Sequence, residues 1–244
     1  MPFTLSHPAI VLPLMYVQKK YVSVTALLAG SVVPDFEYFL RMQKDKSHYS
    51  HTGWGIFWFD IPFGLFLCFV FHALIRKPLI VHLPAFLQKR FISFIDFKWG
   101  AHFKNYWHII LLSLFAGTIS HIGWDAGVHK ASHFFTTTNY FQTINNNNKF
   151  SDLQVYYAVW LIHSLLGVFA LIVGVIKLKS FKDKIVRSKV SGYWLHILVI
   201  CCAISAFRIW QNRFLSWEDV IVTITSAFII SLLITSIRFS KTSY

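Results

Sequence analysis

The stretch "WHIILLSLFAGTISHIGWDAGV", residues 107–128, is long and apolar enough to cross a bilayer, because a helical span needs about 20 predominantly apolar residues. The same stretch carries His121 and Asp125. A charge at membrane depth is costly, so it is normally paired, solvated or bound to a metal ion. The stretch therefore predicts a membrane span with a polar site inside it.

Four further segments have the length and composition of membrane spans, and 193–210 is the shortest of them: 54–76, 155–176, 193–210 and 218–237. Residues 8–17 and 21–40 are also apolar, but prolines and a glycine interrupt them. This pattern predicts short or re-entrant helices packed against the bundle. A true span within 21–40 is the alternative. We therefore predict an all-α, polytopic membrane helix bundle with five to six transmembrane helices.

The composition of the whole chain agrees with this fold class. Of its 244 residues 55% are hydrophobic and 14% are charged, whereas a soluble domain carries about 25% charged residues. All three cysteines lie in apolar runs, which indicates neither a disulfide framework nor a thiolate metal site. We expect one membrane domain over 1–244, with short helices in 1–53, core spans in 54–176 and C-terminal spans in 177–244.

The formal net charge of +13 is concentrated in loops between the spans. Loops 77–106 and 177–192 are rich in Lys and Arg, whereas loop 129–154 has only Lys130 and Lys149. The positive-inside rule places the first two loops in the cytoplasm and 129–154 outside. The basic loops indicate contact with membrane lipids. They lack the clustered face with stacking aromatics that a nucleic-acid partner would require, and no protein partner is indicated.

His121 and Asp125 are one helical turn apart and about 40° apart around the helix axis, so they share one face. Two side chains in this arrangement can bind one ion. His129 and His133 continue the four-residue spacing. We expect these two histidines to lie past the end of the helix as interfacial residues.

Other segments supply compatible side chains, and several belong to the predicted outer ends of spans. These candidates are His7, Asp35, Glu37, His48, His51, Asp60 and His163. His51, His121 and His163 fall at one depth on one side in three separate spans, which predicts one shared site. A single histidine in an apolar helix is more often a packing residue, and this alternative applies to His163. Asp35 could instead complement a helix dipole. Glu37 or Asp60 could serve as a catalytic base.

Five motifs in a fixed order give a family resemblance: "MPFTLSHPAIVLPL", "ALLAGSVVPDFEYFLR", "SHTGWGIFWFDIPFGL", "FHALIRKPL" and "GTISHIGWDAGVH". They resemble the bacterial membrane family catalogued as domain of unknown function 4184, over most of residues 1–170. That family more distantly resembles the LexA-regulated membrane-bound metal-dependent hydrolases. When the metal-binding pattern of those hydrolases is matched residue by residue to this sequence, it falls on His7, Asp35, His48, His51, His121 and Asp125. The sequence reads His48-Tyr-Ser-His51, closer in spacing than the hydrolase pattern and without its Arg, so the choice between these two histidines stays open.

The resemblance implies a multi-pass protein of the bacterial inner membrane with hydrolase activity. The nitrogen and oxygen ligands suit Zn²⁺, Mn²⁺ or Fe²⁺, and similarity of the wider relatives to zinc-dependent phospholipase C favours Zn²⁺. We expect a metal-dependent hydrolase acting on a phosphoester or lipid at the outer membrane interface. The alternatives are a membrane transporter or ion carrier, and a non-catalytic membrane protein with a structural metal site.

Overall fold

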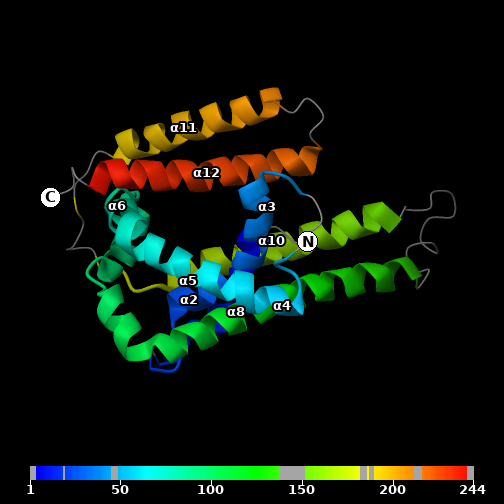
Figure 1. The fold of residues 1–244 in the computed structure, drawn as a ribbon, viewed down its shortest axis with the longest axis horizontal. Helices are drawn as coiled ribbons and strands as arrows, with labels where there is room; N and C mark the ends of the chain where they lie inside the picture. Colours follow the sequence, from blue (N-terminus) through cyan, green and yellow to red (C-terminus); the bar gives the residue numbers. More distant parts are fainter. Residues whose placement is uncertain are drawn as a thin grey trace. The chain divides into compact units, whose positions relative to one another are not determined.

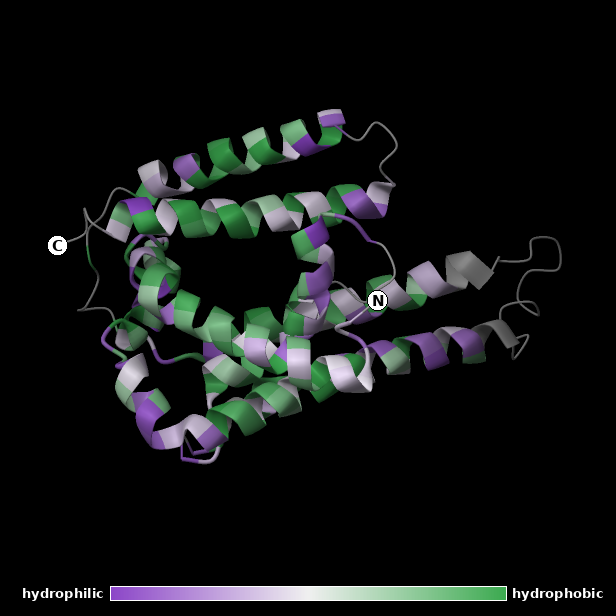
Figure 2. Cartoon of the chain, in the orientation of Figure 1, coloured by the Kyte–Doolittle hydropathy of each residue, from purple (hydrophilic) through white to green (hydrophobic). Residues whose placement is uncertain are grey.

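Five helices in the described part of the chain are long and apolar enough to cross a membrane. The computed structural model describes residues 4–18, 20–44, 49–137, 152–181, 186, 190–211 and 216–240. The five spans are Gly53–Val81, Trp99–Phe134, Tyr156–Lys177, Val190–Gln211 and Trp217–Ser240. Figure 2 shows hydrophobic residues along these helices, and the described residues contain no strand. The prediction of an all-α membrane helix bundle is confirmed, and the protein is a multi-pass membrane protein.

Short helices occupy the N-terminal region, as the interrupted apolar pattern predicts. They are η1 (Thr4–Ser6), α1 (Pro8–Val11), η2 (Leu12–Tyr16), α2 (Val24–Gly30), η3 (Val33–Asp35) and α3 (Phe36–Arg41). Residues 21–40 are thus divided among three short helices, and the alternative of a single span there is wrong.

The first predicted span, 54–76, is one continuous apolar helix with two π-helical turns. It comprises α4 (Gly53–Gly55), the π turn η4 (Ile56–Asp60), α5 (Ile61–Val70), the π turn η5 (Phe71–Ile75) and α6 (Arg76–Val81). Each π turn inserts an extra residue into the helix, and such turns are frequent at functional sites. Buried Asp60 lies in the first of them.

The chain divides into two compact units. The first contains Met1–Pro34, His51–Gly64 and Tyr106–Lys177, and the second contains Asp35–Ser50, Leu65–Asn105 and Leu178–Tyr244. The division falls inside α8 (Trp99–Thr137) at Tyr106, whose φ of −134° and ψ of 25° interrupt the helical geometry. Each unit therefore has its own packing.

In the first unit, α10 (Asp152–Lys177) runs beside the second part of α8 (Figure 1). Val128 of α8 and Val159 of α10 are buried together, and Trp124 packs against them. The N-terminal η1 also lies against α10. Gly167 allows this close approach, because a Cβ at that position would lie 2.8 Å from the carbonyl oxygen of Ser6.

The first unit also contains a backbone-to-backbone crossing of α2 and α8. A Cβ on Gly30 would meet the carbonyl group of Leu114, and a Cβ on Gly117 would lie 2.8 Å from the backbone nitrogen of Ser31. Small residues allow such crossings in membrane proteins, where close packing replaces the hydrophobic effect. The Thr118 hydroxyl donates a hydrogen bond to the Gly30 carbonyl at 3.4 Å. The crossing therefore fixes α2 against the polar part of α8.

In the second unit, α11 (Val190–Gln211) and α12 (Trp217–Ser240) lie side by side (Figure 1). Hydrogen bonds join them, and two of these are short: the Tyr193 and Ser236 hydroxyls are 2.8 Å apart, and His196 Nδ1 is 2.8 Å from the Thr235 hydroxyl. Side-chain hydrogen bonds of this kind stabilise helix pairs in membranes.

The second unit also brings together two loop segments that the charge pattern assigns to one side of the membrane. Helix α7 (Ala85–Phe91) follows the first span, and η6 (Ile92–Phe94) follows α7. The Lys89 carbonyl accepts a hydrogen bond from the Phe181 backbone N–H at 2.7 Å, and Gln88 accepts one from the Val186 N–H at 2.9 Å. Loops 77–106 and 177–192 are therefore in contact, which agrees with their assignment to the same side of the membrane.

Cysteine labelling tests the predicted orientation. Lys130 and Lys98 are both exposed, and they belong to the segments 129–154 and 77–106, which the charge pattern assigns to opposite sides. In a background with Cys201 and Cys202 changed to serine, we expect a membrane-impermeant maleimide to label Lys130→Cys in intact cells. Lys98→Cys should be labelled only after permeabilisation, and the reverse pattern would invert the topology.

Candidate metal centre

Three short stretches of the first unit supply the side chains of the centre. His7 lies between η1 and α1, at the point where Gly167 admits the backbone of Ser6. His51 precedes Thr52, whose hydroxyl accepts a hydrogen bond from the Gly55 N–H at 2.9 Å and so begins the first span. His121 and Asp125 follow each other by one turn on α8.

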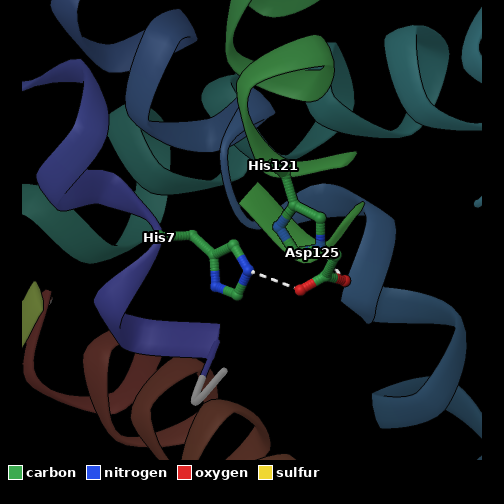
Figure 3. Close-up of side chains that lie close together, drawn as sticks. All are labelled: His7, His121 and Asp125. Carbon is green, nitrogen blue, oxygen red and sulfur yellow. Dashed lines mark hydrogen bonds and ion pairs between the residues drawn. The ribbon is translucent and has the colours of Figure 1, made fainter. Parts of the chain in front are cut away.

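The imidazole nitrogens converge on the carboxylate of Asp125. Its Oδ1 lies 3.1 Å from Nε2 of His7. Its Oδ2 lies 3.6 Å from Nε2 of His121 and 3.7 Å from Nε2 of His51. Figure 3 shows the rings of His7 and His121 beside the carboxylate of Asp125, with the contact between His7 and Asp125 dashed. The ligand atoms of His7, His121 and Asp125 all lie within 4.8 Å of one another.

Backbone carbonyls orient two of these rings. Nδ1 of His121 is 2.8 Å from the Ser31 carbonyl oxygen, and Nδ1 of His7 is 3.3 Å from the Thr4 carbonyl oxygen. A carbonyl oxygen can only accept, so Nδ1 carries the proton in the His121 ring, and also in the His7 ring in the tautomer that bonds Thr4. Metal-binding histidines commonly donate their second N–H to a carbonyl in this way, which leaves Nε2 as the ligand atom.

The carboxylate of Asp125 gives the centre a buried negative charge that a bound cation would offset. With Nδ1 of His7 protonated, the lone pair of Nε2 faces Asp125 Oδ1 at 3.1 Å, and both atoms can then bind one ion. With Nε2 protonated instead, the same contact is a hydrogen bond from His7 to the carboxylate.

The spacing of the donor atoms also fits a metal ion. A tetrahedral ion with bonds of about 2.0–2.1 Å separates its ligand atoms by about 3.3 Å. The three contacts to Asp125, at 3.1, 3.6 and 3.7 Å, bracket that value. Oδ2 of Asp125 is buried and has no hydrogen-bond partner among the described residues. Three imidazoles and a carboxylate are ligands that Zn²⁺ prefers.

The centre is closed on most sides. His7 and His121 are 0% exposed and Asp125 is 6% exposed, whereas His51 is partly exposed. The His7 and His121 rings are stacked, with centroids 3.9 Å apart and planes inclined by 17°. A small molecule would therefore approach from the edge that His51 forms.

His163 lies outside this group of ligand atoms. Its Nδ1 donates to the Val159 carbonyl of its own helix at 2.8 Å. Its ring centroid is 6.3 Å from that of Trp124, and the Trp124 centroid is 6.1 Å from that of His7. Trp124 thus contacts both histidines, and these contacts favour the packing role for His163.

Asp35 and Glu37 belong to the second unit. Asp35 is buried at the residue that precedes α3, a position where a carboxylate complements the helix dipole. Both oxygens of Glu37 accept hydrogen bonds: Oε1 from Arg41 at 2.6 Å, and Oε2 from the Tyr49 N–H at 3.1 Å and the Ser50 hydroxyl at 2.9 Å. These contacts favour a structural role for Glu37 over that of a general base.

The structural role of Glu37 predicts a specific effect on stability. Glu37→Gln removes the negative charge and replaces one accepting oxygen by a donor, while hydrogen bonds to a charged group contribute about 1.5–3 kcal/mol each. We expect the variant to be destabilised by about 2 kcal/mol or more, as measured by thermal unfolding in detergent. Unchanged stability would contradict the structural role.

Asp60 is buried in the π turn η4 and is not among the grouped ligand atoms. Its role as a base stays a prediction. His48 lies outside the described residues. Nε2 of His51 lies 3.7 Å from Asp125 Oδ2.

Several groups that support the centre could not be predicted from the sequence. The carbonyls of Ser31 and Thr4 orient the histidines, but a backbone carbonyl leaves no trace in residue type. Gly30 and Gly117 could have been singled out as small residues in apolar helices, because such residues are frequent at helix crossings. The end of α8 was predicted wrongly: the helix continues to Thr137 and includes His129 and His133.

The comparisons with known proteins identify the family. No curated protein and no solved structure matches the chain significantly. A family model matches residues 1–237, which is nearly the whole chain and includes every residue of the centre. The chain therefore belongs to the family described as Domain of unknown function (DUF4184).

Proposed function

We propose that this chain is a membrane-bound metal-dependent hydrolase whose metal ion, Zn²⁺ by preference, is held by His7, His51, His121 and Asp125. The observation that supports the proposal most directly is the convergence of three imidazoles on one buried carboxylate. His7 and His121 face the carboxylate through Nε2 with Nδ1 already donating to a carbonyl, which is the arrangement of a histidine ligand.

A bound divalent cation supplies Lewis-acid polarisation of a phosphoryl or acyl oxygen and activates water for attack at neutral pH. His7, His121 and Asp125 are buried, which shields the site from water, whereas His51 is partly exposed. Asp60 remains the candidate for the catalytic base, because the hydrogen bonds of Glu37 occupy both of its oxygens.

The proposed substrate is a phosphoester or lipid at the outer membrane interface. Trp54 and Trp58, three and seven residues after His51, are 83% and 55% exposed. Exposed tryptophans at the start of a span are typical of the membrane–water interface, so the open edge of the centre lies beside that interface. α-Helical spans and the resemblance to bacterial membrane proteins support a bacterial inner-membrane location.

A structural metal site is the second candidate, and the ligand count favours it. Structural zinc sites use four protein ligands, whereas catalytic sites keep one position for water or substrate. If all four side chains bind one ion, the site is closed. If His51 leaves or is replaced by water, the site has the open position of a hydrolase.

Metal analysis followed by an activity screen tests the proposal. Detergent-purified wild type is compared with His121→Ala and with His51→Ala for bound metal, then for hydrolysis of phosphoester and lipid-ester substrates. We expect about one ion per chain in the wild type, loss of it in His121→Ala, and activity that a chelator removes and Zn²⁺ restores.

Each contrary outcome has a definite meaning. Equal, negligible metal in all three proteins would overturn both the hydrolase and the structural site. Metal without hydrolysis of any substrate class, together with loss of stability on chelation, would support the structural site instead.

A further inference from the structure

The exposed end of α8 carries two histidines that the buried centre does not use. The part of α8 that follows the interruption at Tyr106, residues 107–137, corresponds to about 46 Å at 1.5 Å per residue. The hydrocarbon core is only about 30 Å thick, so α8 continues well beyond one membrane thickness. His129 and His133 belong to this helix, not to a loop, and both are exposed.

The four-residue spacing explains why one row of side chains is buried at one end and exposed at the other. Each step of four residues rises about 6 Å and rotates about 40° around the axis. The row therefore leaves the buried face gradually: His121 and Asp125 are buried, and His129 and His133 are exposed. The row connects the aqueous surface to the centre in steps of one helical turn.

We infer that His129 and His133 form a second divalent-cation site, at the exposed end of α8, which captures ions for the buried centre. The capture of a cation rests on the histidine pair alone, whereas its delivery to the centre rests on the proposed function. The donor atoms are two imidazoles, so the site suits Zn²⁺, Cu²⁺, Ni²⁺ or Fe²⁺ more than Mg²⁺ or Ca²⁺.

The surroundings of the pair suit weak, reversible binding. Two side chains one turn apart on a helix face can share one ion, and water completes its coordination. The Tyr156 ring stacks on His129, with centroids 5.5 Å apart and planes inclined by 27°. Stacking restrains the imidazole plane and leaves the nitrogens at the ring edge accessible. Exposed Lys130 lies about 100° around the helix from His129, and its charge lowers the affinity.

A cation site at the exposed end of α8 would supply ions to the buried centre. His7 and His121 are fully buried and Asp125 is nearly so, so an ion in bulk water has little direct access to them, and the partly exposed His51 marks the other approach. Asp125 is one turn from His129 on the same helix, and its carboxylate is the next donor along the row. A weak outer pair followed by a tighter inner site favours transfer inward.

Titration of metal-free, full-length protein in detergent with Zn²⁺ alone tests the inference. We expect calorimetry to resolve one tight and one weaker ion in the wild type. The double variant His129→Ala/His133→Ala should lose the weaker ion and keep the tight one. Each single variant, His129→Gln or His133→Gln, should lower the affinity for the weaker ion by about 100-fold, the low end of the gain from joining two ligands. Rapid mixing with Co²⁺ should show severalfold slower loading of the centre in the double variant, with the same final content.

His108→Ala is the matched control, because His108 is an exposed histidine of α8 with Lys104 and Leu112 one turn away on either side. It should change neither the weaker ion nor the loading rate. Retention of the weaker ion by the double variant would overturn the capture site, and an unchanged loading rate would overturn its delivery role. A wild type that binds only the weaker ion would support the capture site while overturning the proposed function.

Discussion

Asp125→Asn is expected to lower the affinity for Zn²⁺ by at least about 100-fold, because loss of even an outer-shell partner of a metal ligand costs about 10- to 100-fold. Asp125 is the side chain that His7, His51 and His121 all face, at 3.1, 3.7 and 3.6 Å. Asparagine keeps the shape of the side chain but removes the charge that offsets the cation. Titration with a competing chelator measures the change.

Two control variants distinguish a ligand from a general effect on charge or folding. Asp96→Asn removes an exposed carboxylate and should retain the wild-type affinity. His163→Gln replaces a histidine that bonds its own helix and contacts Trp124, and it should also retain the ion. If Asp125→Asn binds Zn²⁺ as tightly as these controls do, Asp125 is not a ligand.

Gly117→Ala is expected to destabilise the protein by about 1–3 kcal/mol, the usual cost of overpacking a tight contact. The added methyl group would meet the Leu27 carbonyl and lie 2.8 Å from the Ser31 nitrogen. These are backbone atoms, which cannot rotate away as a flexible side chain can. Because the Ser31 carbonyl orients His121 at 2.8 Å, the shift should also weaken metal binding. Thermal unfolding in detergent and Zn²⁺ titration measure the two effects.

The same helix provides matched controls for this substitution. A Cβ at Gly123 or Gly127 would have nothing within 4 Å. Alanine is the better helix former by about 0.5–1 kcal/mol, so Gly123→Ala and Gly127→Ala should be neutral or stabilising. Equal behaviour of all three alanine variants would show that the crossing of α2 and α8 is not tightly packed.

Membrane spans were predictable because the bilayer imposes a simple rule of length and composition. All five predicted spans have a corresponding long helix, and the short N-terminal helices follow from the prolines at 8, 13 and 34. The end of α8 was not predictable by the same rule. Beyond residue 128 the sequence "HKASHFFTT" is too polar for a span, but a helix that has left the hydrocarbon needs no apolar surface. The hydropathy pattern marks the membrane boundary, not the end of the hydrogen-bonded helix.

The membrane depth of the candidate ligands was predictable from the sequence, but the face of the helix bundle toward which each side chain points was not. His51 and His163 were grouped because each lies at the outer end of a span, yet the structure places only His51 beside Asp125. Rotation of a helix about its axis depends on packing partners, which a single sequence does not specify. His7 was a candidate from its residue type, and the resemblance then placed it in the metal-binding pattern. Its contact with Asp125 spans 118 residues, beyond the reach of any local pattern.

That separation has a consequence for biosynthesis. Chains are made at about 5–20 residues per second, so His7 leaves the ribosome about 6–24 s before Asp125 does. The short helices on either side of His7, Thr4–Ser6 and Pro8–Val11, cannot span the membrane themselves and pack on α10, which is made later still. The candidate metal centre can therefore assemble only late in membrane insertion, once the first unit is complete.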